Sequence, residues 1–198
     1  MPDAGRIIAG TARGIRLHPA GPATRPMGDR VKQTCFGILE AATLGPWPRP
    51  FLDVFAGSGA AGLEAISRGA PRAAFLERDR RAIEAIRANL EACGFGSRAT
   101  ILIGDALATL SRSPSPEAMA DGPFGAALLD PPYGDGTLTP ALDRLAEPGS
   151  GWLAEEAVVV AKHFWRDVPA DRVGTLVRVR ERRFGETTLS FYVRGVAP

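Results

Sequence analysis

The chain has 198 residues, of which 45% are hydrophobic and 23% charged, and its formal net charge is +2. This length and composition are those of a soluble globular protein with a full hydrophobic core, which excludes disordered and fibrous proteins. No apolar run approaches the ~20 residues that span a bilayer, and the polar N-terminus has no signal-peptide pattern. We expect a cytoplasmic monomer. We also expect no bound metal, because neither the two cysteines nor His18 and His163 have metal-ligand spacing.

The positive excess lies at the N-terminus. Residues 1–32 hold six Arg or Lys side chains against two acids, whereas the remaining residues hold 18 against 20. Such an arm fits a phosphate-rich partner, although a solvated basic edge has the same pattern. Runs at 6–10 and 15–18 predict a small hairpin, and Asp29 is a good N-cap for a following helix. Turn residues at 45–48 then predict a boundary between an extension, 1–45, and a main domain, 46–198.

After this boundary, apolar runs and helix-like stretches alternate. Strands are expected near 51–55, 73–76, 100–103, 124–129 and 158–160, helices near 60–68, 79–93 and 137–146, and a closing hairpin at 173–179 and 187–193. Alternating strands and helices predict a parallel sheet covered on both faces. The fold class is therefore α/β and Rossmann-like: a mostly parallel seven-stranded sheet with an antiparallel C-terminal hairpin and a small N-terminal hairpin and helix.

A nucleotide-binding loop follows the first of these strands. Gly57, Gly59 and Gly62 form a Gly-x-Gly-x-x-Gly between a strand and a helix, where glycine allows a tight turn and the helix offers free amide donors. By itself this motif fits NAD(P) enzymes and methyltransferases equally, and it also occurs as a plain strand–helix turn. Asp53, four residues before the first glycine, would repel the phosphates of a dinucleotide.

Two further acids follow the second and third strands. Glu77 can accept hydrogen bonds from both hydroxyls of a ribose, and Asp105 lies where the purine amino group of an adenosine ligand would be. Each acid alone has the alternative role of a helix N-cap, which we expect for Asp79. Taken together, these acids favour S-adenosylmethionine over a dinucleotide.

The fourth strand of the main domain ends in Asp130-Pro131-Pro132-Tyr133. Proline has no backbone N–H, so the Asp130 carboxylate and a proline carbonyl can both accept from one amino group. This matters for an amino group on guanine or adenine, whose lone pair is delocalised into the ring. Tyr133 offers a face for a base taken out of its stack. A strand-ending turn is the alternative, but after a strand and downstream of the loop the tetrapeptide predicts amino methylation of a nucleic-acid base.

Nearly the whole chain resembles the RsmD family, the 16S rRNA (guanine(966)-N2)-methyltransferases, which have the class I methyltransferase fold. The resemblance rests on the blocks at residues 6–10, 13–14, 24–26, 29–31, 36, 52–59, 62–65, 77–79, 105–106, 129–133, 184–187 and 189–192. The N-terminal blocks discriminate, because DNA adenine methyltransferases share the central motifs. This chain departs from the family pattern at Met27-Gly28, at residues 32–35 and at Lys162. At the last position, after the fifth strand of the main domain, the family pattern leads us to expect an acid.

The resemblance implies methyl transfer from S-adenosyl-L-methionine to N2 of a guanine in 16S rRNA, within the small ribosomal subunit or its assembly intermediate. Asp130, Pro131, Pro132 and Tyr133 would hold the guanine. The cofactor would be bound by Arg25, Asp29, Asp53, Phe55, Ala56, Gly57, Ser58, Gly59, Glu77, Arg78, Asp105 and Ala106, and RNA by Arg6, Arg13, Arg16 and Arg30.

Four alternatives differ in target or class. A DNA adenine-N6 or other nucleic-acid amino methyltransferase shares the motifs, but DNA enzymes usually need a separate recognition domain. An enzyme that methylates protein amides usually has Asn in place of Asp130. An NAD(P)-dependent oxidoreductase leaves Asp105 and Asp130 unexplained, and a silent RNA-binding module would not need Asp130 and Tyr133.

Overall fold

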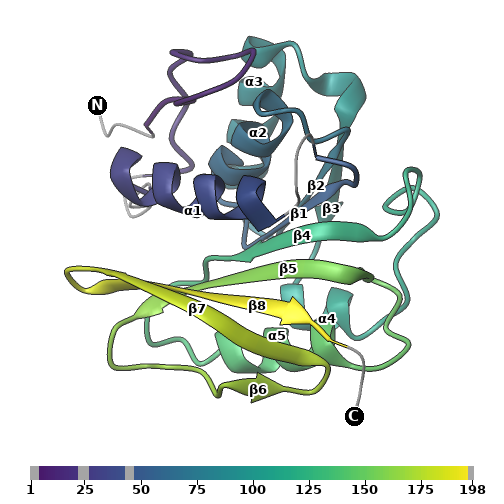
Figure 1. The fold of residues 1–198 in the computed structure, drawn as a ribbon. Helices are drawn as coiled ribbons and strands as arrows, with labels where there is room; N and C mark the ends of the chain where they lie inside the picture. Colours follow the sequence, from purple (N-terminus) through teal and green to yellow (C-terminus); the bar gives the residue numbers. More distant parts are fainter. Residues whose placement is uncertain (1–4, 22–26, 43–46, 196–198) are drawn as a thin grey trace.

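The structure, a computed structural model, describes residues 5–21, 27–42 and 47–195. It is an α/β fold built on one sheet with the strand order β3-β2-β1-β4-β5-β8-β7-β6 (Figure 1). In chain order the elements are α1 (Asp29–Ala42), β1 (Phe51–Val54), α2 (Ala60–Ser67), β2 (Ala73–Glu77), α3 (Arg80–Cys93), a 3-10 turn (Gly96–Arg98), β3 (Ala99–Ile103), α4 (Ala106–Leu110), β4 (Phe124–Leu129), α5 (Leu138–Ala146), β5 (Leu153–Phe164), β6 (Arg172–Val173), β7 (Leu176–Phe184) and β8 (Thr187–Arg194).

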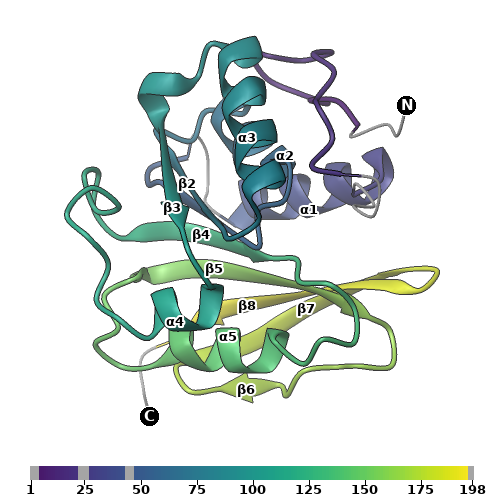
Figure 2. The same ribbon diagram turned by 180° about the vertical axis from the view of Figure 1, so that it is seen from behind.

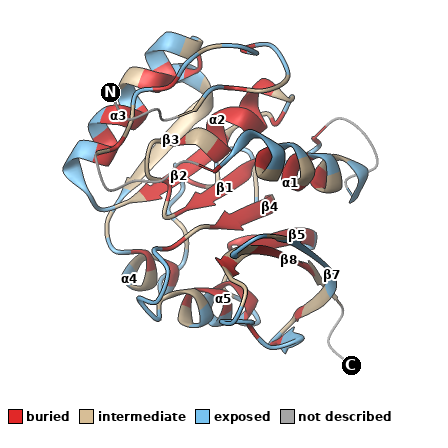
Figure 3. Ribbon diagram, turned by 90° about the vertical axis from the view of Figure 1, so that its left-hand side faces the viewer, coloured by how far each residue is buried: buried red, intermediate tan, exposed pale blue. Residues whose placement is uncertain are grey.

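Helices cover both faces of the sheet. Helices α1, α2 and α3 lie on one face and α4 and α5 on the other (Figures 1 and 2). Successive strand residues point to opposite faces, so Phe51 and Phe75 join the first apolar cluster and Leu52 and Leu76 the second. Nearly all residues of the central strands β1 and β4 are buried (Figure 3), which explains why these strands have continuous apolar sequences rather than alternating ones.

The predicted fold class is confirmed, with one difference in strand number. Strands β1 to β5 pair in parallel, and β8, β7 and β6 continue the sheet as antiparallel strands. The sheet has eight strands instead of seven because the two-residue β6 pairs with the start of β7, a segment too short to leave a pattern in the sequence. None of the helices in the described ranges is long and apolar enough to span a membrane.

The N-terminal segment forms less regular structure than expected and packs onto the rest of the molecule. The expected small hairpin is present in a minimal form: an antiparallel bridge joins Arg6 and Arg16, and the Ile7 and Leu17 amides donate to the Ile15 and Gly5 carbonyls at 2.9 and 3.0 Å. Ile7 and Leu17 of this segment belong to the same cluster as Phe51. The boundary of the proposed division into 1–45 and 46–198 lies within residues 43–46, which are outside the described ranges, and the division stays a prediction.

Buried polar side chains of α2 and α3 hold this segment in place. Glu64 accepts the amide hydrogens of Ile8 and Ala9 at 2.9 and 3.1 Å, and its carboxylate also pairs with Arg68 at 2.7 Å. On α3, Asn89 accepts the His18 amide at 2.6 Å and donates to the His18 carbonyl at 3.0 Å. The core of the molecule therefore includes residues from both sides of the proposed boundary.

Helix α1 begins differently from the expectation. The Lys32 amide donates to the Gly28 carbonyl, so Gly28 precedes the helix and Asp29 lies in its first turn. The Asp29 carboxylate instead accepts Nε and Nη2 of Arg6 at 3.1 and 2.9 Å. Asp79 is the N-cap of α3, as expected, and accepts the Ala82 amide at 2.9 Å.

Candidate active site

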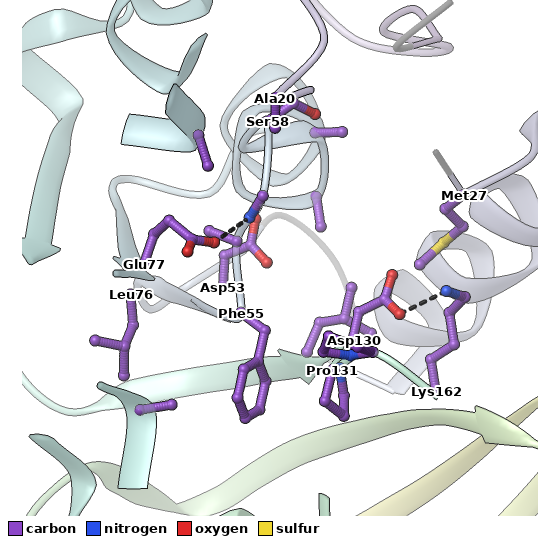
Figure 4. A pocket seen from close by; sticks show the side chains of 18 of the residues that line it. Ala20, Met27, Asp53, Phe55, Ser58, Leu76, Glu77, Asp130, Pro131 and Lys162 are labelled. Atoms are coloured by element: carbon purple, nitrogen blue, oxygen red, sulfur yellow. Dashed lines mark hydrogen bonds and ion pairs between the residues drawn. The ribbon is translucent and has the colours of Figure 1, made fainter. Parts of the chain in front are cut away.

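A cavity of about 890 Å³ opens where β1, β2, β3 and β4 end (Figure 4). The carboxyl ends of parallel strands meet at one edge of a sheet, where α/β proteins bind ligands. Most of the site residues expected from the sequence line this cavity: Asp53, Phe55, Ala56, Gly57, Ser58, Glu77, Arg78, Asp105, Ala106, Asp130, Pro131, Pro132 and Tyr133. The fold thus brings the expected cofactor residues and the expected catalytic residues into one space.

The glycine loop turns sharply between β1 and α2. Gly57 and Gly59 have positive φ angles of 55° and 77°, and Phe55 has a φ of 62°, which is uncommon for a residue with a side chain. Gly62 serves packing, because a Cβ there would lie 2.3 Å from a ring carbon of Phe75. Two glycines therefore allow the turn, and the third lets α2 lie close to β2.

Backbone amides of this loop donate hydrogen bonds to two carboxylates. Glu77 Oε2 accepts the Gly57 amide at 2.8 Å and its Oε1 accepts the Arg78 and Asp79 amides at 2.8 and 2.9 Å. Asp53 Oδ2 accepts the Gly62 amide at 2.8 Å. Burial raises the pKa of Asp53 well above its ordinary value, and the Gly62 hydrogen bond opposes this effect. In dinucleotide-binding folds such loop amides and the helix N-terminus face a pyrophosphate, whereas here two of these amides already face carboxylates.

Asp105 has two roles in the structure. Its Oδ1 accepts the Ala108 amide at 3.1 Å, which makes it the N-cap of α4. Its Oδ2 pairs with Arg78 Nη1 at 3.0 Å while the residue lines the cavity. The capping role, which the sequence left as an alternative, is therefore present, and it holds the carboxylate beside the cavity.

Asp130 forms an ion pair with Lys162, a residue that departs from the family pattern. Lys162 does not follow the fifth strand but lies inside β5, and the register places it beside Asp130, one position beyond the Leu129–Ala161 pair. Lys162 Nζ lies 2.5 Å from Asp130 Oδ1, in the wall of the cavity (Figure 4). Burial raises the pKa of Asp130, and the Lys162 ammonium partly opposes this shift.

The prolines and Tyr133 form the outer part of this wall. Pro131 is buried and Pro132 exposed, and Tyr133 is 45% exposed. The Tyr133 hydroxyl and Thr187 Oγ1 share a hydrogen bond of 2.7 Å, which ties the tetrapeptide to β8. The Tyr133 ring therefore lies at the mouth of the cavity and is open to a ligand that enters from solvent.

Some expected site residues lie elsewhere. Asp29 is not among the residues lining the cavity, because its carboxylate is engaged by Arg6 at the surface. Gly59 forms the N-cap of α2 behind the loop. Arg25 lies outside the described residues. Of the arginines expected to bind RNA, Arg6 forms the ion pair with Asp29, whereas Arg13, Arg16 and Arg30 are exposed.

The cavity also has lining residues that the motifs did not indicate. Met27, Lys32 and Val31 come from the segment around the start of α1, and Glu186 and Thr187 from the turn between β7 and β8. The Lys32 ammonium is buried and donates to the Arg6 carbonyl at 2.8 Å. Met27 and Lys32 are departures from the family pattern, whereas Val31, Glu186 and Thr187 belong to blocks that resemble the family, so the sequence marks these positions only indirectly.

The lining of the cavity is predominantly acidic. Among its described residues seven are acidic, namely Asp53, Glu77, Asp79, Asp105, Asp130, Asp135 and Glu186, and three are basic, namely Lys32, Arg78 and Lys162. An acidic lining attracts a cationic ligand and repels an anionic one. The electrostatics of the site therefore favour a ligand that carries positive charge.

Comparison with known proteins identifies the family. The family model described as "Conserved hypothetical protein 95" matches residues 5–193. The ribosomal RNA small subunit methyltransferase D of Escherichia coli (strain K12) is 37% identical over 157 residues, 78% of this chain and 72% of that protein. YlbH of Bacillus subtilis (strain 168) is 34% identical over 190 residues, 94% of this chain and 97% of YlbH. The solved structure of yhhF from Escherichia coli superposes with a TM-score of 0.79 at 30% identity and covers 96% of this chain and 97% of that one. The fold is that of a class I methyltransferase, and the chain belongs to the RsmD family of rRNA methyltransferases.

Proposed function

We propose that this protein transfers a methyl group from S-adenosyl-L-methionine to the exocyclic N2 amino group of a guanine in small-subunit rRNA. The observation that carries the proposal is the position of Asp130, at the end of β4 and in the same cavity as Asp53, Glu77 and Asp105. The E. coli relative is named for methylation of the small-subunit rRNA, and the guanine and its N2 atom rest on the family resemblance.

The lining of the cavity fits this cofactor. S-adenosylmethionine carries a sulfonium and an ammonium group, and the described lining has seven acidic and three basic side chains. In this proposal Glu77 binds the ribose hydroxyls, Asp105 the adenine amino group, and Asp53 the amino-acid end of the cofactor. The same lining disfavours the dinucleotide alternative. The Gly57 and Gly62 amides, which a pyrophosphate would need as donors, already donate to Glu77 and Asp53.

The cofactor supplies an electrophilic methyl group that needs no acid to leave its sulfur. The protein must position and polarise the target amine, since alignment is the main contribution to such a transfer. Lys162 holds Asp130 through Oδ1, and no described residue donates to Oδ2. Oδ2 is therefore the oxygen that accepts an N–H of the guanine, together with the carbonyl of Pro131.

The transfer replaces one N–H hydrogen of the guanine by a methyl group, so a proton must leave the nitrogen. Burial raises the pKa of Asp130, which makes its carboxylate a better proton acceptor than an exposed aspartate. The Lys162 ammonium opposes this rise in the pKa and so favours the ionised carboxylate. The guanine stacks against Tyr133 at the cavity mouth, an interaction worth roughly 1–3 kcal/mol.

Product analysis tests the proposal. The purified protein is incubated with S-adenosylmethionine that carries a tritiated methyl group and with small ribosomal subunits, assembly intermediates or naked 16S rRNA from a strain that lacks the activity. The labelled RNA is then digested to nucleosides. N2-methylguanosine is the expected product, with the assembled particle or its intermediate as the better substrate. Label in N6-methyladenosine, or transfer to DNA alone, would replace this proposal by the amino methyltransferase alternative.

A further inference from the structure

A line of aromatic rings leads from the cavity mouth to the surface. The ring centroids of Tyr133 and Phe164 are 6.2 Å apart, and those of Phe164 and Trp165 are 6.1 Å apart. Tyr133 follows β4, whereas Phe164 ends β5 and Trp165 comes directly after it. The spacing and tilt are those of favourable aromatic contacts, so the three rings form one continuous patch beside the site.

Two guanidinium groups lie on the last ring of this line. Arg166 Cζ is 4.6 Å and Arg183 Cζ is 4.0 Å from the Trp165 ring centroid. Arginine on an aromatic face gains a cation–π attraction, which here holds two like charges near one another. Both arginines are exposed. We refer to Phe164, Trp165, Arg166 and Arg183 as the arginine–aromatic patch.

The charge of this patch is not neutralised by neighbouring acids. Within the described residues, no carboxylate forms an ion pair with Arg166 or Arg183. Arg178, on the same strand as Arg183, shows the contrast, since it pairs with both Asp171 and Glu181. Arg183 Nε donates only to the Gly185 carbonyl, at 2.8 Å. The patch is therefore a local site of uncompensated positive charge.

Backbone contacts fix the patch relative to the cavity. The Trp165 amide donates to the Glu186 carbonyl at 3.0 Å, and Glu186 and Thr187 line the cavity. Thr187 also shares a hydrogen bond with the Tyr133 hydroxyl. The turn between β7 and β8 projects from the edge of the molecule (Figure 1). One rigid hairpin thus carries both part of the cavity wall and part of the patch.

We propose that the arginine–aromatic patch binds the nucleotides that flank the target guanine, as a single-stranded segment of the rRNA. Flat rings stack with bases of any sequence, and guanidinium groups bind phosphates in a bidentate manner. Sequence-specific RNA recognition mostly uses single-stranded loops, bulges and ends, whose bases can be splayed out, so a surface that binds splayed nucleotides fits a position next to Tyr133. This inference rests on the proposed function and adds a second RNA-binding surface to the N-terminal arginines.

Charge-removing variants test the patch. In R166Q/R183Q both guanidinium charges are lost, and R87Q/R144Q removes two exposed charges from α3 and α5 as a matched control. Methyl transfer to small subunits is measured as kcat and KM at several salt concentrations. The expected result is a KM for RNA at least tenfold higher, an unchanged kcat, and a slope of log affinity against log salt that is smaller by roughly 1.4, the value for two phosphate contacts on a single strand.

The outcomes separate this inference from the proposed function. If the unmodified protein transfers no methyl group to rRNA, the proposed function is wrong, and this inference, which rests on it, is wrong as well. If the unmodified protein is active and R166Q/R183Q has the KM of R87Q/R144Q, only the patch is wrong. A raised KM with an unchanged salt slope would assign the surface to a ribosomal protein and overturn the RNA assignment. Melting temperature and binding of S-adenosylhomocysteine, measured on both variants, establish that they are folded.

Discussion

Four of the seven acidic side chains in the described lining of the cavity follow strands β1 to β4 or lie at their ends, and their hydrogen-bond partners separate them into two kinds. Asp53, Glu77 and Asp105 each accept at least one backbone amide, so their positions are set by the loop and the helix starts around them. Asp130 is set by the Lys162 side chain, from the neighbouring strand. The first three are suited to hold a ligand in place, and the fourth to polarise and deprotonate a second one.

Replacement of Asp130 should separate catalysis from cofactor binding. Asp130→Ala is expected to reduce methyl transfer at least a hundredfold, about 2.7 kcal/mol of transition-state stabilisation, because no acceptor replaces Oδ2. The affinity for S-adenosylhomocysteine, measured by calorimetry, should stay nearly unchanged. Asp143→Ala, at an exposed position of α5, is the control.

The Lys162 ammonium loses its partner in Asp130→Ala, so the variant could lose activity through its fold. Asp130→Asn keeps the shape of the side chain, and its melting temperature shows whether the fold persists. Full activity of either folded variant on small subunits would contradict the proposed mechanism.

Ionisation of Asp53 should make the free energy of unfolding depend on pH. Its pKa is raised by burial in the folded protein, so the folded state binds a proton more tightly than the unfolded chain does. The stabilisation is therefore fully present below the unfolded pKa, near 3.8, and is lost as the pH rises through the raised pKa. Asp53→Asn cannot ionise and keeps an oxygen for the Gly62 amide.

The free energies of unfolding of the unmodified protein and of Asp53→Asn, measured in denaturant without cofactor, should therefore converge in acid. Towards neutral pH the Asn variant should become the more stable of the two, and its affinity for S-adenosylhomocysteine should fall. A difference that is constant across the pH range would show that the Asp53 pKa is not raised.

At the scale of elements, the N-terminal segment depends on α2 for its position. Glu64 is fully buried and binds the Ile8 and Ala9 amides as well as Arg68, whose side chain is 5% exposed. The register between β4 and β5 similarly places Lys162 against Asp130. In both cases a polar or charged side chain is held by a partner from a different part of the chain.

Glu64→Ala should destabilise the protein strongly. The Ile8 and Ala9 amides would lose their acceptor, at a cost of about 1–3 kcal/mol for each part-buried group, whereas Arg68 would keep its ion pair with Glu40. Denaturant unfolding measures this loss, and Glu91→Ala, at an exposed position of α3, should change the stability by no more than about 0.5 kcal/mol. Hydrogen exchange at the Ile8 and Ala9 amides should accelerate more than exchange in β4. Equal acceleration at both places would show that Glu64 has no local role in holding the segment.

At the scale of the whole molecule, one edge of the sheet combines three surfaces. The acidic cavity opens there, the turn between β7 and β8 forms one wall, and the arginine–aromatic patch lies beside it. An acidic cavity next to a basic surface suits a cationic cofactor and a polyanionic substrate at the same time. The two ligands are thus distinguished by charge before any specific contact forms.

Ligand-dependent melting tests this distinction. A ligand that binds only the folded state stabilises it by about 2.7 kcal/mol at a hundredfold excess over its Kd. S-adenosylhomocysteine should raise the melting temperature, and NADH at the same concentration should leave it unchanged, because the lining repels a pyrophosphate. A rise with NADH that matches the rise with S-adenosylhomocysteine would restore the oxidoreductase alternative.

Much of this protein follows from local sequence. The alternation of strands and helices, the glycine loop, the Asp79 cap and the tetrapeptide after β4 are each encoded within about a dozen residues. Periodicity, turn residues and capping act over such distances. The parallel order of the first strands then required that the acids following them meet at one edge of the sheet, so most of the cavity lining could be named from the sequence.

Other features depend on contacts between distant residues. Lys162 and Asp130 are 32 positions apart, Glu64 and Ile8 are 56 apart, and Tyr133 and Thr187 are 54 apart. Local patterns do not encode such pairs, so they indicate neither the contact of Lys162 with Asp130 nor the contact of Asp29 with Arg6. The sequence by itself therefore determined the fold class, the glycine loop and the tetrapeptide that follows β4. Only the tertiary structure decided which charges are paired, because strand register and helix packing bring those side chains together.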